Sequence, residues 1–512
     1  MPIRMVNDPN RDNNNSGGGG PRFGGLVKFL PLIIGFLLKR PKLLIPILII
    51  GFLFYYFDGC NTITGGGDQN YDNSAFNTGG ELDPEEYAKA DIFNFLDGTN
   101  SLPQRVSLDQ FAPKRLNQGA QGSCVAWANA YSARTILEAR RTGKDPNSVA
   151  FSPSFMYNQI KLGNDCQGSY IVRAVENLNK YGAAPYNLMP YNPNSCTQQP
   201  SDQAYSIAQN FKIKGATRIA ENPNGAMASA DVIQIKHTIA AGAPVAIGMM
   251  VGGSFMQGMM GKELWIPTRS DYDQYGFGGH AMTIIGYDDN LSGGALQIMN
   301  SWGPEWGNNG IAWIRYADFI KFNKEAYAYA PMGAVNEPIP DKFDVEFGLV
   351  NSTTGSAIPL KSISNGLFRT TGKVSPGTRF KIKIQNNIEC YGYIFGQETD
   401  NSSYVLYPST AKHSAYCGVT GSRVFPHSQS LTPDDKGTRD AFAVLISRKP
   451  IDYKKTNDAI SAMRNDDYYA AFKSALGNQL INNINFRTST GVSFTAPSAD
   501  NKMALFVIEV DK

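Results

Sequence analysis

A glycine-rich turn that runs directly into a helical segment is the feature that most restricts the fold of this 512-residue chain. The turn contains Gly119 and Gly122, and the residues from Cys124 to about Arg141 have helical composition. A cysteine in the first turn of a helix feels the positive end of the dipole and unpaired N–H groups, which favour the thiolate. Cys124 is therefore a candidate nucleophile, and the alternative is a small residue buried for packing.

Two predicted strands follow much later in the chain. The stretch from Gly278 to Asp289 reads as a glycine loop, an apolar strand and a turn, and Ala295 to Asn300 reads as a second strand. If the two form a hairpin centred near Leu291, Asn300 lies within about one strand step of His280. A side-chain amide there can orient the imidazole. The alternatives are a core histidine and an asparagine that caps a strand end.

These blocks resemble the papain-like cysteine proteases. Gln118 stands six residues before Cys124 in the family's glutamine, glycine, serine, cysteine order, and His280 lies in its glycine, histidine, alanine strand pattern. Asn300 opens its asparagine, serine, tryptophan, glycine signature. Further matches lie at 151–157, 181–185, 190–191 and 242–245, so the resemblance runs from about Leu102 to Ala330. It implies an α+β fold of two lobes, one helical and one resembling a β-barrel, over residues 101–335.

The resemblance also implies the chemistry. Cys124 would attack a peptide carbonyl as a thiolate paired with protonated His280, which then protonates the leaving amine. Asn300 would hold the imidazole tautomer, and Gln118 would donate its amide to the oxyanion beside the backbone N–H of Cys124. Three neighbours are expected to bind substrate or shield the site: Trp302, Gly122 and Ser123.

The cysteines depart from the family pattern. Gln121 stands where the family usually has a cysteine, and Val125 stands where it has a tryptophan. Cys166 occupies the place of the missing cysteine's mate, and Cys196 matches a later family cysteine, so the resemblance predicts that these two pair. Two free thiols are the alternative. A second bridge is predicted between two cysteines of the C-terminal part, Cys390 and Cys417.

The basic charge of the chain is concentrated near its N-terminus. The net charge is +3, but residues after Phe57 carry 40 basic and 42 acidic side chains. The folded part therefore lacks the electrostatic footprint of a nucleic-acid-binding protein. Residues 1–25 include the tract RDNNNSGGGG and are predicted to be a disordered cytoplasmic tail.

Two apolar runs predict a membrane anchor within residues 26–58. Leu26 to Leu38 and Leu43 to Phe57 are each shorter than the roughly 20 residues that span a bilayer, and Lys39 to Lys42 separates them. Positive charge before the second run and Asp58 after it favour an extracytoplasmic location, in the periplasm or at the cell surface, for the rest of the chain. The alternatives are a cleaved or lipidated segment near Cys60 and a two-helix hairpin. Residues 59–100 are predicted to be a linker with one short helix.

Residues 341–512, after a proline-rich boundary, are predicted to form a β-sandwich. The expected strands lie at 343–350, 380–385, 391–395, 404–407, 441–447 and 503–510, and helical spacing appears between Asp458 and Asn483. This part resembles an uncharacterised β-rich domain that bacteria append to proteases and surface enzymes, which suggests an envelope partner. His413 and His427 have no neighbouring cysteine pair, so neither a metal nor another cofactor is predicted.

The leading hypothesis is a bacterial cysteine peptidase that is tethered to the membrane and cleaves peptides or proteins on the extracytoplasmic side. No propeptide is visible, so inhibition by a long helix is not expected. The alternative is a catalytically silent papain-like domain that binds envelope components. A third hypothesis is an exopeptidase, which needs a segment that blocks one end of the cleft.

Overall fold

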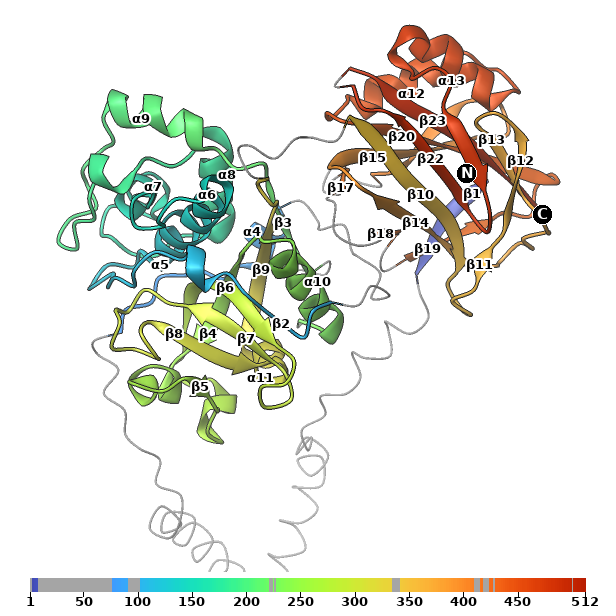
Figure 1. Cartoon of the computed structure of the whole chain (residues 1–512). Coiled ribbons are helices and arrows are strands. Elements are labelled where there is room, and N and C mark those ends of the chain that lie inside the picture. Colours follow the sequence, from blue (N-terminus) through green and yellow to red (C-terminus); the bar gives the residue numbers. More distant parts are fainter. Residues whose placement is uncertain are drawn as a thin grey trace, which may run out of the picture. The chain divides into compact units, whose positions relative to one another are not determined.

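The computed structural model describes residues 2–7, 76–90, 102–220, 224, 227–333, 341–408, 415–417, 423–426, 429–499 and 501–512. The predicted anchor at 26–58 lies outside these residues. Among the residues that are described, no helix is both long and apolar enough to cross a bilayer. Two folded parts are present, one on each side of residues 334–340, and each is described by itself (Figure 1).

A nearly continuous buried helix organises the first lobe of the peptidase part. It begins at α5 (Cys124–Ala126), continues as the π-helical segment η3 (Trp127–Arg134) and ends with α6 (Thr135–Thr142). Every residue from Cys124 to Ala139 is buried. Gly143 ends the helix at φ 67°, a left-handed conformation that glycine adopts without a Cβ penalty. The other helices of this lobe are α7 (Pro153–Ile160), α8 (Ile171–Lys180) and α9 (Asp202–Ala208).

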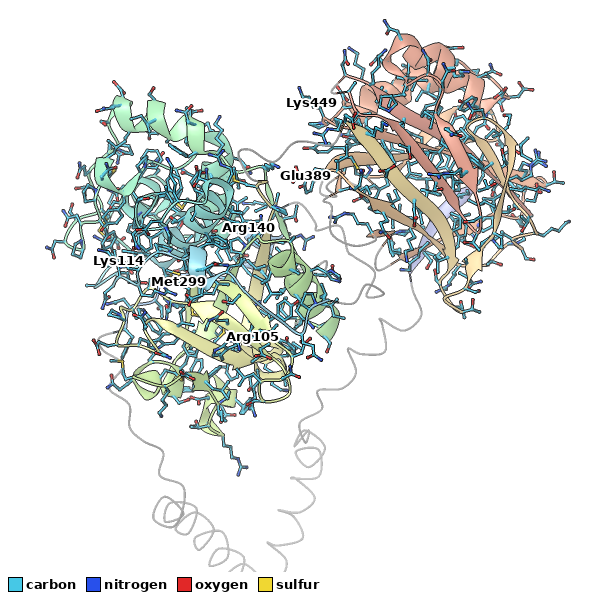
Figure 2. The ribbon with its side chains drawn as sticks, in the orientation of Figure 1. Arg105, Lys114, Arg140, Met299, Glu389 and Lys449 are labelled. Carbon is cyan, nitrogen blue, oxygen red and sulfur yellow. A yellow bond between two sulfur atoms is a disulfide. The ribbon has the colours of Figure 1, made fainter. Side chains whose placement is uncertain are left out.

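A mixed sheet forms the second lobe. Its central strands are β4 (Val245–Val251), β6 (Gly278–Asp288) and β7 (Ala295–Met299), and Met299 is labelled in Figure 2. Thr283 pairs with Met299, which confirms the hairpin register predicted around Leu291. The sheet has the order β3-β9-β4-β6-β7-β8-β5, with β2 on β6. Its remaining elements are β2 (Arg105–Ser107), β3 (Ala216–Arg218), β5 (Leu264–Trp265), β8 (Ile311–Arg315), β9 (Asn323–Tyr329), α10 (Ser229–Ala240) and α11 (Tyr316–Phe322).

Residues 76–90 lie within the same folded part. Residues 76–82 form an irregular segment with one isolated bridge from Gly80 to Ser169, and α4 (Pro84–Tyr87) follows as a single helical turn. Asp83 starts this turn by accepting a hydrogen bond from the backbone N–H of Glu85 at 2.8 Å. Tyr87 is only 1% exposed. The region predicted to be a linker with one short helix therefore contains such a helix, and that helix is anchored in the protein.

Residues 341–512 form two sheets with a shared apolar core between them. The alternation of buried and exposed residues along β10 (Lys342–Asn351) places Phe343, Val345 and Phe347 in this core. One sheet has the order β1-β19-β14-β10-β22-β21, with β11 on β10 and β18 on β14. The other has the order β12-β13-β23-β20-β15-β16, with β17 on β15.

The strands of this part are bounded as follows. The first sheet contains β11 (Ala357–Ile358), β14 (Phe380–Asn386), β18 (Arg423–Phe425), β19 (Gln429–Pro433), β21 (Asn485–Thr488) and β22 (Val492–Pro497). The second contains β12 (Leu360–Ser364), β13 (Leu367–Thr370), β15 (Cys390–Gln397), β16 (Ser403–Tyr407), β17 (Tyr416–Cys417), β20 (Arg439–Ser447) and β23 (Met503–Asp511). Helices α12 (Tyr453–Ser461) and α13 (Tyr468–Leu476) contribute to a separate apolar cluster with β15, β20 and β23.

The beginning of the chain differs from its prediction. The sequence predicts that residues 1–25 are disordered, but Ile3–Asn7 form strand β1 beside β19. Ile3 is 0% exposed in the core of the C-terminal part. Burial of this side chain and pairing of its backbone oppose the loss of chain entropy, which composition alone could not show.

Candidate active site

The cysteine and histidine predicted to react are brought together from the two lobes. Cys124 is the first residue of α5, and His280 lies on β6. The backbone N–H of Ala281 donates to Sγ of Cys124 at 3.4 Å, so the sulfur lies against the strand that carries the imidazole. Both Cys124 and His280 are 0% exposed. The sulfur of Cys124 thus lies next to the residue that follows His280, on the strand that carries the imidazole of a thiol–imidazole mechanism.

Asn300 fixes the protonation pattern of the imidazole. Oδ1 of Asn300 accepts the backbone N–H of Ser301 at 2.7 Å and lies 2.8 Å from Nε2 of His280. Since this oxygen can only accept, Nε2 of His280 carries a proton and donates it. Nδ1 of His280 has no hydrogen-bond partner among the described residues and is the nitrogen left to exchange a proton with the thiol.

Trp302 covers the histidine. Its ring stacks on the imidazole of His280 with centroids 4.3 Å apart and an interplanar angle of 20°. Trp302 is 4% exposed. An aromatic cover of this kind removes water from the His280–Asn300 hydrogen bond and thereby strengthens it.

Gln118, the predicted oxyanion-binding residue, has both ends of its side-chain amide engaged. Its Oε1 accepts the hydroxyl of Ser301 at 2.7 Å, so its Nε2 is the donor end of the amide. Nε2 donates to the carbonyl oxygens of Gln121, at 2.9 Å, and Asn77, at 3.1 Å. The group expected to stabilise an oxyanion is therefore bonded to a carbonyl oxygen of the chain itself.

The two residues before the cysteine have different surroundings. The backbone of Gly122 is bonded to Cys166, whose carbonyl accepts its N–H at 3.0 Å, and it also meets Gly79 closely. The hydroxyl of Ser123 is 2.8 Å from that of Tyr191. The Ser123 side chain is thus engaged by the helical lobe, and any contact it makes with substrate must come from its backbone.

Residues 76–82, here called the cleft segment, contact Gln118, Trp302 and Gly122 of the candidate site. The carbonyl oxygen of Asn77 accepts from Nε1 of Trp302 at 2.8 Å as well as from Gln118. Phe76 packs edge-on against Trp302, with ring centroids 5.2 Å apart. The side-chain amide of Asn77 donates to the carbonyl of Gly119 at 3.3 Å. The cleft segment thus occupies the side-chain amide of Gln118, the donor that the sequence predicts for an oxyanion.

Two glycines carry the cleft segment past the reactive pair. The N–H groups of Gly79 and Gly80 donate to the carbonyl of Gly279 at 3.2 and 2.9 Å, next to His280. On the opposite wall, the N–H of Ser169 donates to the carbonyl of Gly79 at 2.9 Å. A Cβ on Gly79 would lie 2.4 Å from Cα of Gly122, so only glycine fits at this position.

Tyr87 anchors the chain beyond the cleft segment. Its hydroxyl donates to the carbonyl of Ala326 at 3.0 Å and accepts the N–H groups of Ala220, at 3.2 Å, and Ala326, at 3.3 Å. Its ring packs edge-on against Tyr327 at 5.1 Å. A buried hydroxyl with three backbone partners holds α4 firmly.

The covered site favours neutral groups. Burial raises the pKa of the Cys124 thiol to about 12, and backbone hydrogen bonds, the first from Ala281, lower it by less. Burial also lowers the pKa of His280 to about 4, against the hydrogen bond with Asn300. The sequence predicted a thiolate at the helix start, but in this covered state desolvation outweighs the helix.

The other predicted cysteines and histidines lie as follows. A disulfide joins Cys166 and Cys196, with Cα atoms 5.7 Å apart. Cys390 and Cys417 are free thiols at paired positions of β15 and β17. His413 and His427 lie outside the described residues. Within the described ranges, no cluster of three or more His, Cys, Asp or Glu residues could hold a metal ion.

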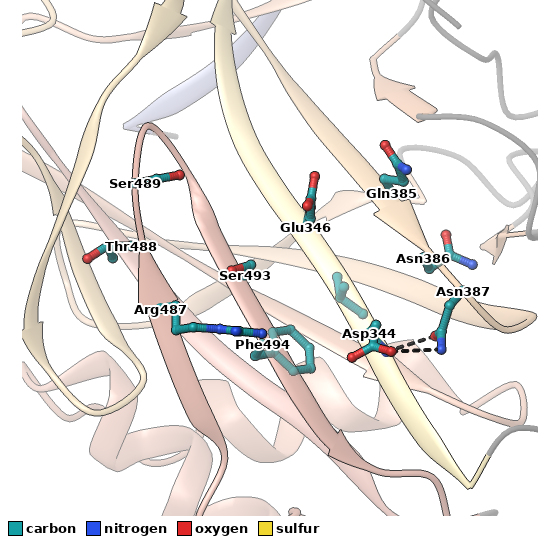
Figure 3. Close-up of a pocket in the computed structure, with 11 residues that line it drawn as sticks. Asp344, Glu346, Gln385, Asn386, Asn387, Arg487, Thr488, Ser489, Ser493 and Phe494 are labelled. Carbon is teal, nitrogen blue, oxygen red and sulfur yellow. Dashed lines mark hydrogen bonds between the residues drawn. The ribbon is translucent and has the colours of Figure 1, made fainter.

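A hollow of about 710 Å³ lies in the C-terminal part (Figure 3). Polar residues of β10, β14, β21 and β22 line it, among them Glu346, Gln385 and Arg487. The carboxylate of Asp344 accepts from the Asn387 amide at 3.1 Å and from the Thr495 hydroxyl at 2.6 Å. These bonds already engage the Asp344 carboxylate. The residues that line the hollow do not bring together buried reactive side chains such as those around Cys124.

The family model and the sequence relatives are consistent with this geometry. The model of the papain family cysteine protease matches residues 107–332. An uncharacterized peptidase C1-like protein of Acanthamoeba polyphaga mimivirus is 29% identical over 255 residues, which cover 49% of this chain and 78% of that protein. Cathepsin B-like CP2 of Giardia intestinalis is 26% identical over 238 residues, covering 45% and 74% respectively. The solved structure of xylellain, a cysteine protease from Xylella fastidiosa, is 24% identical with a TM-score of 0.37, covering 51% and 93%.

The buried thiol and imidazole between two lobes define a cysteine peptidase, which is a hydrolase. Residues 107–332 of the chain form a papain family cysteine protease domain.

The sequence did not reveal the cleft segment. Gly79 and Gly80 stand in a polar stretch without periodicity, and neither has a side chain by which a pattern could identify it. Glu81 to Asp91 carried the one usable signal, an acidic start followed by Tyr87, which is typical of a short capped helix. The contacts of this helix join residues more than 200 positions apart, so local sequence could not predict them.

Proposed function

We propose that the chain is a latent peptidase whose own cleft segment covers the active site until it is displaced. Once the segment leaves, Cys124 gives its proton to Nδ1 of His280, and the sulfur bonds to the carbonyl carbon of the substrate. The imidazolium protonates the leaving amine, and water then hydrolyses the thioester with His280 as base. Asn300 holds the imidazole through Nε2, and Gln118 donates to the oxyanion.

The hydrogen bonds of the Asn77 carbonyl oxygen carry this proposal. A neutral carbonyl oxygen sits on Nε2 of Gln118 and Nε1 of Trp302, at 3.1 and 2.8 Å. The glycines that follow are hydrogen-bonded to both walls of the cleft. A substrate must therefore break these contacts before its own carbonyl can reach Gln118.

The Gly79→Val substitution tests latency. The added Cβ would lie 2.4 Å from backbone atoms of Gly122, so the variant should expel the cleft segment. We expect an epoxide probe to label Cys124 about tenfold faster, and peptide turnover to rise in parallel, which corresponds to about 1.4 kcal/mol. Mass spectrometry of the labelled peptide and a fluorogenic peptide library give the two readouts.

The control is Glu85→Ala. It changes an exposed side chain of α4, the short helix that follows the cleft segment, and should leave both rates unchanged. Cys124→Ala should abolish labelling and turnover while the fold persists. Equal labelling rates for wild type and Gly79→Val would refute latency. Labelling without hydrolysis of any peptide would favour the silent binding module, an alternative that the family match does not favour.

We also propose that residues 26–58 tether the peptidase to a membrane and that its folded parts face the extracytoplasmic side. The apolar runs and the basic residues between them support the tether. The disulfide between Cys166 and Cys196 supports an oxidising compartment. In that setting, the C-terminal β-rich part would contact an envelope partner.

A further inference from the structure

Strand β1 places the start of the chain inside the C-terminal part. The carbonyl oxygen of Pro2 accepts the backbone N–H of Asp434 at 2.7 Å. The hydroxyl of Tyr404 accepts the N–H of Ile3 at 3.1 Å and donates to its carbonyl at 2.8 Å. These bonds join residues that are about 400 positions apart in the sequence.

The side chains of β1 agree with its backbone contacts. Ile3 is 0% exposed and belongs to the core between the two sheets, and Met5 packs against that core. Arg4, between them, is exposed. This alternation is the pattern of a strand with one buried face. Tyr404 lies on β16, in the other sheet, so Ile3 is bonded to both layers of the C-terminal part.

Residues 76–90, which come after the stretch 8–75, are also held in place by contacts with a folded part. Residues 76–90 are bonded to the peptidase part through the cleft segment and Tyr87. Only residues 334–340 separate the two folded parts, and this stretch contains polar residues and two prolines. It is far shorter than the roughly 20 apolar residues that a crossing needs. All described residues therefore lie in one compartment, because strands on opposite sides of a bilayer cannot pair into one open sheet.

From these contacts we infer that residues 2–7, the peptidase part and the C-terminal part lie on the same side of the membrane, an inference that rests on the tether proposed above. A single crossing would separate Ile3 from Tyr404, so the predicted orientation with a cytoplasmic N-terminus is incompatible with β1.

Site-directed labelling of the full-length chain in cells tests this inference. In a Cys60→Ser background, Asn14→Cys and Ser74→Cys each place one thiol outside the two apolar runs. A membrane-impermeant maleimide that carries a polymer mass tag is added before and after permeabilisation. We expect both positions to behave alike. Labelling of one position in intact cells and of the other only after permeabilisation would overturn the inference.

Hydrogen exchange tests the strand itself. In Ile3→Asp, the buried charge should detach β1, and the Asp434 amide should exchange at least about tenfold faster. Arg4→Asp, at the exposed neighbouring position, should leave that rate unchanged. Equally fast exchange in wild type and Ile3→Asp would show that β1 does not pair. Peptide turnover should be the same in both variants, which separates this test from the test of latency.

Discussion

Two opposing influences act on the thiol of Cys124. The start of a helix and the N–H of Ala281 favour the thiolate, whereas complete burial favours the neutral thiol. Burial prevails while the cleft segment is in place, and it raises the pKa of Cys124 to about 12. The same residue can therefore be inert in one state and nucleophilic in another, without any change in its covalent surroundings.

At the residue scale, the pH dependence of Cys124 alkylation should show whether burial suppresses the thiolate. Because the raised pKa of Cys124 lies far above neutrality, the thiolate fraction should rise about tenfold per pH unit. We expect the rate of iodoacetamide labelling of wild type to increase without a plateau between about pH 6 and 10. In Gly79→Val, where water reaches the sulfur, the rate should level off within that range. Identical profiles would contradict the role of burial.

At the scale of elements, α4 and β9 share a buried carboxyl. Glu325 on β9 is 4% exposed and lies 3.2 Å from the Tyr327 hydroxyl. Burial raises its pKa to about 8, and the nearby carboxylates of Asp83 and Glu86 act in the same direction. Because the folded pKa exceeds the ordinary value of 4.5, the neutral form stabilises the fold below about pH 4.5. That stability is lost as the pH rises through about 8.

Glu325→Gln should remove this dependence. The amide keeps the shape of the protonated carboxyl but does not ionise, so unfolding midpoints should fall less between about pH 5 and 8 than in wild type. Differential scanning calorimetry at several pH values gives the comparison. Glu85→Gln, at an exposed position of α4, serves as the control. A slope in Glu325→Gln equal to that of wild type would contradict the assignment.

The predicted bridge between Cys390 and Cys417 also belongs to this scale. The two thiols occupy paired positions on neighbouring strands and are free in the structure. Their mutual hydrogen bond raises the pKa of Cys390 and lowers the pKa of Cys417, whereas burial acts to raise both. Their pairing stays a prediction from the sequence.

At the scale of the whole molecule, the proposed tether lies within residues 8–75 and can be tested separately from the folded parts. If this stretch is inserted in a bilayer, carbonate extraction of membranes should leave the intact chain in the pellet. A variant lacking residues 26–57 should appear in the supernatant and still hydrolyse peptides. Release of the intact chain into the supernatant would exclude an integral anchor.

Much of the fold could be predicted because its signals are local. The glycine turn before Cys124, the helix that follows and the strand hairpin around Leu291 each depend on neighbouring residues. The alternation along β14 predicted a half-buried strand for the same reason. The helical spacing between Asp458 and Asn483 corresponds to the end of α12 and to α13, which begins after its N-cap Asp467.

The sequence by itself determined the class of chemistry, since Gln118, Cys124, His280 and Asn300 stand in a recognisable order with suitable local structure. Only the tertiary structure decided whether the residues that carry this chemistry are covered or accessible. It places Gly79 and Gly80 beside His280 and Ile3 beside Tyr404, contacts that join distant parts of the chain. Backbone hydrogen bonds and a single buried side chain make these contacts, and neither leaves a periodic pattern in the sequence.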